Sequence, residues 1–91
     1  VKQDYKMAID YFRKAEEMGN KNGSYGIAEC YYYGCGIKQD YEKAYNIFYD
    51  LMENYDDTRS TYYIGLMYYE GHVVEQDYER AFNIFKYLMK K

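Results

Sequence analysis

The amino-acid sequence predicts an all-α fold, an α-solenoid of antiparallel helix pairs with about five helices. The first observation is repetition: residues 37–48, IKQDYEKAYNIF, recur in closely similar form at residues 1–12 and 74–85. The second is the spacing within each copy, where an alanine is followed four residues later by a phenylalanine. This spacing places a small and a large side chain on one helix face and does not fit the period of a strand. Repetition at intervals of about 20–50 residues is typical of solenoids.

An aspartate precedes each copy of the alanine–phenylalanine pattern, at Asp4, Asp40 and Asp77. A short acceptor side chain at the start of a helix binds the free N–H groups of the first turn, and its charge suits the helix dipole. We therefore expect these three residues to be N-caps and not catalytic acids. The helices that they begin are predicted at about residues 4–18, 40–54 and 77–90.

A second type of segment lies between these copies. Residues 23–34 align with residues 60–71, and their apolar positions share one face of a helix. Gly65 lowers helix propensity, and such a glycine usually permits the close approach of a neighbouring helix. Gly34 and Gly71 are predicted to end the two helices. The helices themselves are predicted at about residues 22–33 and 58–70.

Composition and charge exclude some classes of partner. The net charge is −3 and the chain has no basic block, so nucleic acid is not an expected partner. No segment approaches the roughly 20 apolar residues that span a bilayer, so we expect no membrane insertion. The low count of cysteines, 2, favours an intracellular location. The chain begins at Val1, and repeat-like sequence reaches both ends, which indicates an excerpt of a longer protein.

The segment at residues 34–44, GCGIKQDYEKA, resembles the signature of the Sel1-like repeat family, a relative of the tetratricopeptide repeats. The residues that carry the resemblance are Gly34, Gly36, Asp40, Tyr41 and Ala44, with Gly65, Gly71, Asp77, Tyr78 and Ala81 in the following copy. The resemblance implies a right-handed α-α superhelix, with a half repeat at residues 1–19 and repeat units at about 22–54 and 58–90 of a single array over 1–91. It also implies a scaffold or adaptor that holds a protein or peptide partner on its concave helical face.

Two loops depart from the family pattern. Val73 stands where the second glycine of the signature belongs. If that glycine takes a positive φ, a β-branched residue does not follow cheaply, so we expect this loop to differ in backbone from the loop at residues 34–40. The turn near residues 55–57 is expected to be one residue longer than its counterpart near residues 19–21, and it lacks the glycine found there.

The predicted partner-binding residues lie on the outward faces of the second type of helix. They are Tyr25, Glu29, Tyr32, Tyr33, Tyr62, Leu66, Tyr69 and Glu70. A row of exposed tyrosines suits peptide recognition, because each ring gives wide contact with few rotatable bonds to freeze. Tyr32 and Tyr69 are expected to be the most open. The competing interpretation is that these rings pack between adjacent helices.

The cysteines and the single histidine give no metal site or cofactor site. Cys30 aligns with Met67 at a core position, and Cys35 lies in a loop. A cysteine-rich subfamily of Sel1-like proteins carries disulfides, but it places a cysteine in the second helix of each pair, where this chain has none. We expect two free thiols, with a disulfide as the alternative. His72 lies in a loop without a catalytic partner at motif spacing and is predicted to be a surface residue.

Three hypotheses for function follow. The first is a protein-interaction module with a shallow tyrosine-lined groove. The second is a structural spacer, or a segment that self-associates through an exposed terminal helix, for which Phe82, Ile84 and Phe85 are the candidate residues. The third, a β-lactam hydrolase, lacks support because neither Ser24 nor Ser60 has a lysine three residues on. We therefore expect no catalytic activity.

Overall fold

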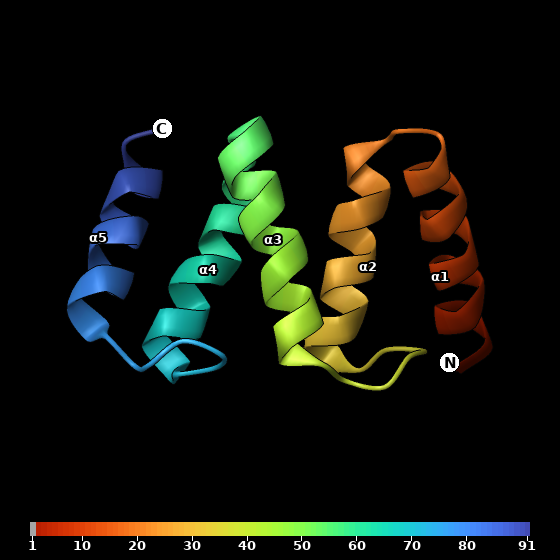
Figure 1. The fold of residues 1–91 in the computed structure, drawn as a ribbon, viewed down its shortest axis with the longest axis horizontal. Helices are drawn as coiled ribbons and strands as arrows, with labels where there is room; N and C mark the ends of the chain where they lie inside the picture. The colour runs from red at the N-terminus through yellow and green to blue at the C-terminus, as the bar shows by residue number, and fades with distance from the viewer. Residues whose placement is uncertain (1) are drawn as a thin grey trace. The chain divides into compact units, whose positions relative to one another are not determined.

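The computed structural model describes the backbone from residue 2 and the side chains from residue 5 to the end of the chain. These residues form five helices and no strand (Figure 1). The helices are α1 (Lys2–Glu17), α2 (Lys21–Tyr33), α3 (Tyr41–Tyr55), α4 (Thr58–Glu70) and α5 (Tyr78–Met89). The predicted all-α fold is confirmed, and every predicted helix end lies within about two residues of the observed one.

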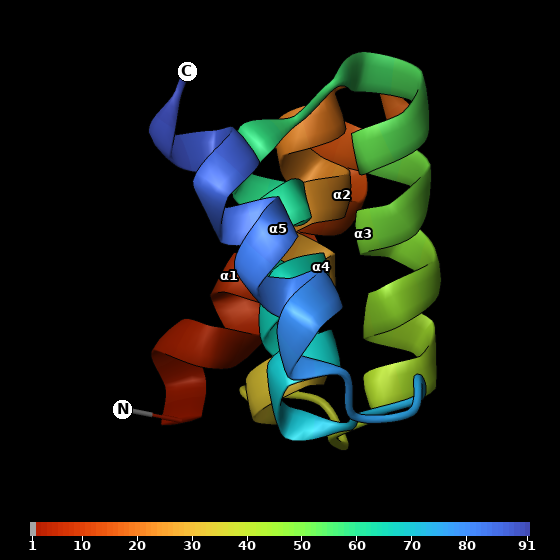
Figure 2. The same cartoon turned by 90° about the vertical axis from the view of Figure 1, so that its left-hand side faces the viewer.

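The chain divides into two compact units, Val1–Ile47 and Phe48–Lys91. In the first unit α1 and α2 pack as an antiparallel pair, and in the second α4 and α5 do so (Figures 1 and 2). The core of the first unit contains Ile9, Ile27, Ala28, Cys30, Tyr32 and Ala44. The core of the second contains Phe48, Leu51, Tyr63, Ile64, Met67 and Ala81. Ala44 and Ala81, two alanines of the repeat pattern, are fully buried.

Two of the three predicted N-caps are confirmed. The Asp40 carboxylate accepts a hydrogen bond from the Lys43 N–H at 3.1 Å, and the Asp77 carboxylate accepts one from the Arg80 N–H at 3.0 Å. The third, Asp4, lies within α1, which begins at Lys2, and its side chain is outside the described residues. The caps of α3 and α5 therefore have the same chemistry at equivalent positions.

The start of α4 has a buried cap that the sequence did not predict. Asp57 accepts hydrogen bonds from the N–H groups of Arg59 and Ser60, and its second oxygen lies 2.9 Å from the Arg59 guanidinium. Burial raises the pKa of the Asp57 carboxyl, but the hydrogen bonds from Arg59 and Ser60 and the charge of Arg59 outweigh it, so the net pKa is lowered. Asn20 caps α2 at the equivalent position by accepting a hydrogen bond from the Asn22 N–H at 2.9 Å, so Asp57 provides a charged, buried cap in place of a neutral one.

The expectation of a longer turn is wrong, because α3 extends to Tyr55 and α4 begins at Thr58, which leaves two linking residues against three between Glu17 and Lys21. Asp56 has the positive φ of this link, 50°, where the first link has Gly19.

Glycines bring neighbouring helices close together in both units. A Cβ atom added at Gly65 of α4 would lie 2.7 Å from the Phe85 ring and 3.0 Å from Ile84, which confirms the predicted close approach. In the first unit, a Cβ at Gly26 of α2 would lie 2.6 Å from the Phe12 ring. In both units a phenylalanine ring occupies the space that a glycine leaves free.

The expectation that the loop around Val73 has a different backbone is wrong. Val73 has a φ of 66°, close to the 75° of Gly36, its counterpart in the first loop. Both loops are held by equivalent hydrogen bonds: the N–H of Asp40 donates to the Tyr31 carbonyl, and the N–H of Asp77 donates to the Tyr68 carbonyl. Because these bonds tie the far end of each loop back to the preceding helix, Val73 adopts a conformation that is costly for a β-branched residue.

A glutamine amide makes a second contact with the same helix end in each loop. The Gln39 side-chain amide donates to the Tyr32 carbonyl at 2.7 Å, and the Gln76 amide donates to the Tyr69 carbonyl at 2.9 Å. The end of the preceding helix is thereby bonded to the start of the next. Both loops therefore share these bonds although the residue at the turn differs, and the second loop also has a bond from the Val74 N–H to the His72 carbonyl at 2.6 Å.

We predict that Val73→Gly stabilises the protein by about 1 kcal/mol. The substitution removes backbone strain of about 1–3 kcal/mol and adds a smaller entropy cost in the unfolded chain. The reciprocal change, Gly36→Val, should destabilise by about 2–4 kcal/mol, because its Cβ would also lie 2.9 Å from the Ile9 side chain. Urea unfolding followed by circular dichroism measures both. A destabilised Val73→Gly variant would contradict the assignment of strain.

We predict that Asp57→Ala lowers the free energy of unfolding by about 2 kcal/mol, because two N–H groups of α4 lose their acceptor. Asp57→Asn keeps an acceptor and should cost less. The folded-state pKa of Asp57 lies below its ordinary value of 3.8, so the ionised carboxyl stabilises the fold above that pH. The stability difference between wild type and Asp57→Asn should shrink as the pH falls below about 3.8. A difference that does not change with pH would contradict this role.

Candidate partner-binding surface

Three of the predicted residues form one row on α2. Tyr25, Glu29 and Tyr33 are spaced four residues apart, so they follow one another along a face of the helix. The Tyr25 hydroxyl donates to the Glu29 carboxylate at 3.0 Å, and both side chains are half-buried. Tyr33 is the most open of the three, with 56% of its surface exposed. The row therefore combines a carboxylate held by a hydrogen bond with an exposed aromatic ring.

The prediction that Tyr32 is open is wrong, because it is 6% exposed. Its ring packs edge-on against Tyr33 at 4.9 Å between centroids and against Tyr41 at 5.3 Å. Its counterpart Tyr69 also meets a tyrosine of the following helix, but position 70 holds a glutamate and supplies no second ring. Tyr32 is therefore a core residue of the first unit and not part of a contact surface.

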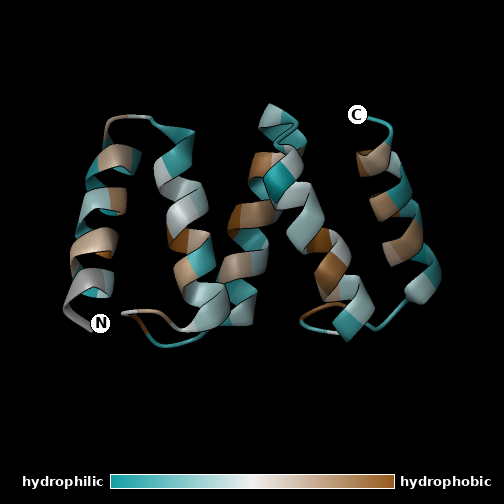
Figure 3. Ribbon diagram, turned by 180° about the vertical axis from the view of Figure 1, so that it is seen from behind, coloured by the Kyte–Doolittle hydropathy of each residue, from teal (hydrophilic) through white to brown (hydrophobic). Residues whose placement is uncertain are grey.

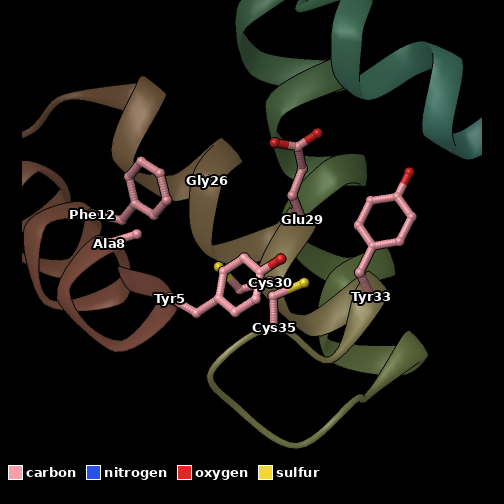
Figure 4. A pocket seen from close by; sticks show the side chains of 8 residues that line it. All are labelled: Tyr5, Ala8, Phe12, Gly26, Glu29, Cys30, Tyr33 and Cys35. Carbon is pink, nitrogen blue, oxygen red and sulfur yellow. The ribbon is translucent and has the colours of Figure 1, made fainter. Parts of the chain in front are cut away.

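A cavity of about 310 Å³ opens between α1 and α2 beside this row (Figure 4). Its lining residues are Tyr5, Ala8 and Phe12 of α1, Gly26, Glu29, Cys30 and Tyr33 of α2, and Cys35 of the following loop. Nearly all of this lining is aromatic, small or sulfur-containing, and Glu29 is its single charged group. The cavity therefore suits an apolar side chain with a positive charge next to it.

The origin of this cavity is visible in the repeat alignment. Gly26 aligns with Tyr63, whose ring stacks on Phe48 at 4.4 Å with an interplanar angle of 5°. Phe12, the counterpart of Phe48, faces a glycine instead of a ring. Tyr5, Phe12 and Gly26 are not among the binding residues predicted from the sequence. The contrast between Gly26 and Tyr63 is the signal in the sequence that distinguishes the two units.

The four predicted residues of α4 are more exposed than those of α2. Tyr62, Tyr69 and Glu70 are exposed, and Leu66 is half-buried. The expected openness of Tyr69 agrees with its exposed fraction of 52%. Its ring lies 5.2 Å from that of Tyr78. The two rings border a second cavity, of about 390 Å³, which Phe82 and Phe85 of α5 complete.

Three segments of the chain, residues 1–20, 22–49 and 58–87, match the family model described as Sel1 repeat. The chain belongs to the Sel1 repeat family. The crystal structure of a Sel1 repeat protein from Oxalobacter formigenes resembles it with a TM-score of 0.80 at 22% sequence identity. This match covers 99% of the present chain and 36% of that protein, so the chain spans about a third of its length. No curated protein sequence matches the chain.

Membership in the Sel1 repeat family gives the class of function. Sel1 repeats are generally protein-interaction modules, and the family is a non-catalytic repeat scaffold. Among the described helices, none is long and apolar enough to cross a bilayer. In the part of the chain with described side chains, no three His, Cys, Asp or Glu residues are grouped so that they could hold a metal ion. His72 lies 3.4 Å from the Glu70 carboxylate and is partly covered.

The two cysteines of the first Sel1 unit are free thiols that differ in access. Cys30 is buried and Cys35 is half-buried. The helix end brings them together, because the N–H of Cys35 donates to the Cys30 carbonyl at 3.0 Å in the manner of a Schellman motif. Burial, reinforced by Cys35 and by the Glu29 charge, raises the pKa of the Cys30 thiol. A buried thiol with a raised pKa holds little of the reactive thiolate at neutral pH.

We predict that Cys35 is alkylated roughly tenfold faster than Cys30 at neutral pH, because alkylation needs both thiolate and access. Timed reaction with iodoacetamide, followed by peptide mass spectrometry, gives the two rates. Cys30 should react at the rate of Cys35 once the protein is unfolded in urea. Equal rates in the folded protein would contradict the burial of Cys30.

Proposed function

We propose that the chain is a protein-interaction module whose α2 surface binds a peptide segment of its partner. The observation that carries this proposal is the cavity between α1 and α2, where an apolar lining meets the single carboxylate of Glu29. The family supplies the general role of protein interaction. The proposal assigns no catalytic role to the chain.

The chemistry of the cavity defines the peptide. Rings of Tyr5, Phe12 and Tyr33 offer wide apolar contact, so a leucine, methionine or aromatic side chain is the proposed anchor. Glu29 is held in place by the Tyr25 hydroxyl, which orients its charge without neutralising it. A lysine or arginine next to the anchor would pair with this carboxylate. The proposed ligand is therefore a short segment with one apolar anchor and one adjacent basic residue.

In the second unit we propose that the outward face of α4 is a further contact surface. Tyr62 is exposed, and its ring centroid lies 5.8 Å from that of Tyr63 in an edge-on contact and 5.8 Å from that of Phe85 in a tilted one. A ring fixed in this way loses little side-chain entropy when a partner binds. Glu70 and the half-buried Leu66 complete the surface and give it the same mixture of apolar and acidic groups.

The test is selection of peptides from a displayed random library, followed by measurement of their affinity by fluorescence anisotropy. Selected peptides should share an apolar residue beside a lysine or arginine. Tyr33→Ser should weaken them roughly tenfold or more, as loss of an aromatic anchor contact does. Glu29→Gln should weaken them less and should reduce the dependence of affinity on salt, because it removes a charge pair.

Tyr55→Ser is the matched control, because Tyr55 is exposed to nearly the same extent as Tyr33 and lies in the other unit. It should leave the affinity unchanged. Circular dichroism of each variant checks that the helices are intact. Selected peptides that bind Tyr33→Ser as tightly as wild type would overturn the assignment of the α2 surface. Failure to select any peptide with an apolar anchor would do the same.

A further inference from the structure

An apolar stripe runs along the face of α5 that borders the second cavity. Tyr78, Phe82, Phe85 and Met89 are spaced by four, three and four residues, which places all four on one side of the helix. Tyr78, Phe82 and Met89 are exposed, and Met89 is the most open of them at 85%. Apolar positions recur along the length of α5 in Figure 3. This spacing is that of the contact seam between two paired helices.

The charged residues beside the stripe define which partner helix fits. Glu79 and Lys86 are seven residues apart and therefore lie on the same edge of the seam, two helical turns from each other. Lys86 Nζ lies 5.7 Å from the centroid of the Phe82 ring, so its charge borders the seam. Within the described side chains, neither residue forms an ion pair on its own chain. A partner helix therefore needs a positive and a negative group in reversed order along this edge.

We infer that α5 pairs with α5 of a second copy of this chain, antiparallel and related by a two-fold axis. In this arrangement Phe82 lies opposite Phe85 of the second copy, and Tyr78 lies opposite Met89. The same register places Glu79 opposite Lys86 of the second copy, and by symmetry the pair occurs twice. In a parallel pair Glu79 and Lys86 would lie on opposite sides of the seam from their copies, so neither would gain a charged partner and the complementarity would be lost.

The cavity of the second unit provides the site for the most exposed side chain of the stripe. It measures about 390 Å³ and is lined by Tyr69, Tyr78, Phe82 and Phe85. In the antiparallel register, Met89 of the second copy faces this aromatic lining. A methionine side chain is flexible, and its sulfur makes favourable contacts with aromatic rings. Each copy thus contributes one methionine and receives another, which is the reciprocity that an isologous interface requires.

The helix that carries this face is fixed to its own unit at both ends. At its start, Asp77 caps the first turn, and Phe85 in the middle packs against Gly65 of α4. At its end, the Tyr87 hydroxyl and the Lys91 ammonium both bond to the Asp56 carboxylate in the turn before α4. The helix that carries the seam is therefore already ordered, so little conformational entropy would be lost on association.

The test is sedimentation velocity of the chain over a concentration series from low micromolar to near millimolar. Wild type should shift from monomer to dimer as concentration rises. Phe82→Asp should remain monomeric, because it places a charge in the centre of the seam. Tyr11→Asp, a matched change at an exposed ring of α1 in the other unit, should dimerise as wild type does. Circular dichroism verifies that each variant is folded.

Charge exchange tests the register itself. Glu79→Lys alone gives an edge with two positive charges, and Lys86→Glu alone gives an edge with two negative charges, so each variant should dimerise roughly tenfold more weakly than wild type. An equimolar mixture of the two should form heterodimers, and the double variant should recover wild-type dimerisation. Helix stability alone would not produce this recovery on mixing.

Three results would overturn the inference. The first is a wild-type chain that is monomeric throughout the series, which would leave α5 to some other partner. The second is dimerisation that Phe82→Asp does not affect, since the interface would then lie elsewhere. The third is a mixture of the charge variants that associates no better than either alone. Peptide binding by the α2 surface is independent of all three, because the variants lie in α5.

Discussion

The packing of one phenylalanine in each repeat is the contact on which the rest of the fold depends. Phe12 lies over Gly26, Phe48 stacks on Tyr63, and Phe85 lies against Gly65. The ring is the same in each case, but the surface that receives it differs. A glycine lets the helix backbone approach the ring directly, whereas a tyrosine provides a parallel face at stacking distance. The residue that receives the ring therefore decides how closely the two helices can approach at this point.

The loops show that hydrogen bonds can impose a backbone on an unfavourable residue. Gly36 and Val73 have nearly the same positive φ, although only glycine adopts it without cost. In each loop a glutamine side-chain amide and the N–H of the following aspartate both donate to carbonyl groups at the end of the preceding helix. Several bonds acting together outweigh the preference of one residue, which is how strained positions persist in folded proteins.

The sequence predicted the helices and two caps because these depend on local chemistry. The spacing of apolar residues and a short acceptor at the helix start are properties of a few adjacent residues. Asp40 and Asp77 accept hydrogen bonds in the first turn of their helices, as this local chemistry predicts. The burial of Tyr32 and the φ of Val73 depend on ring contacts and hydrogen bonds across a loop, and periodicity does not record them. The α1–α2 cavity was missed for the same reason, since it results from which residue faces Phe12. The difference between Gly26 and Tyr63 is visible in the sequence. Its effect on packing can be interpreted only once Phe12 and Phe48 are known to lie against these two positions.

The difference between Gly26 and Tyr63 also bears on how such an array can change during evolution. The two positions are equivalent, and the helices around them keep the same caps and the same loop bonds. One substitution at this position alters the shape of a cavity without altering the backbone signals that build the repeat. After duplication of a repeat, the residues that build its helices and loops could stay the same while the residue at this position changes. The lining beside the repeat phenylalanine therefore differs between the two units, while both keep the aspartate caps and the loop bonds that build the repeat.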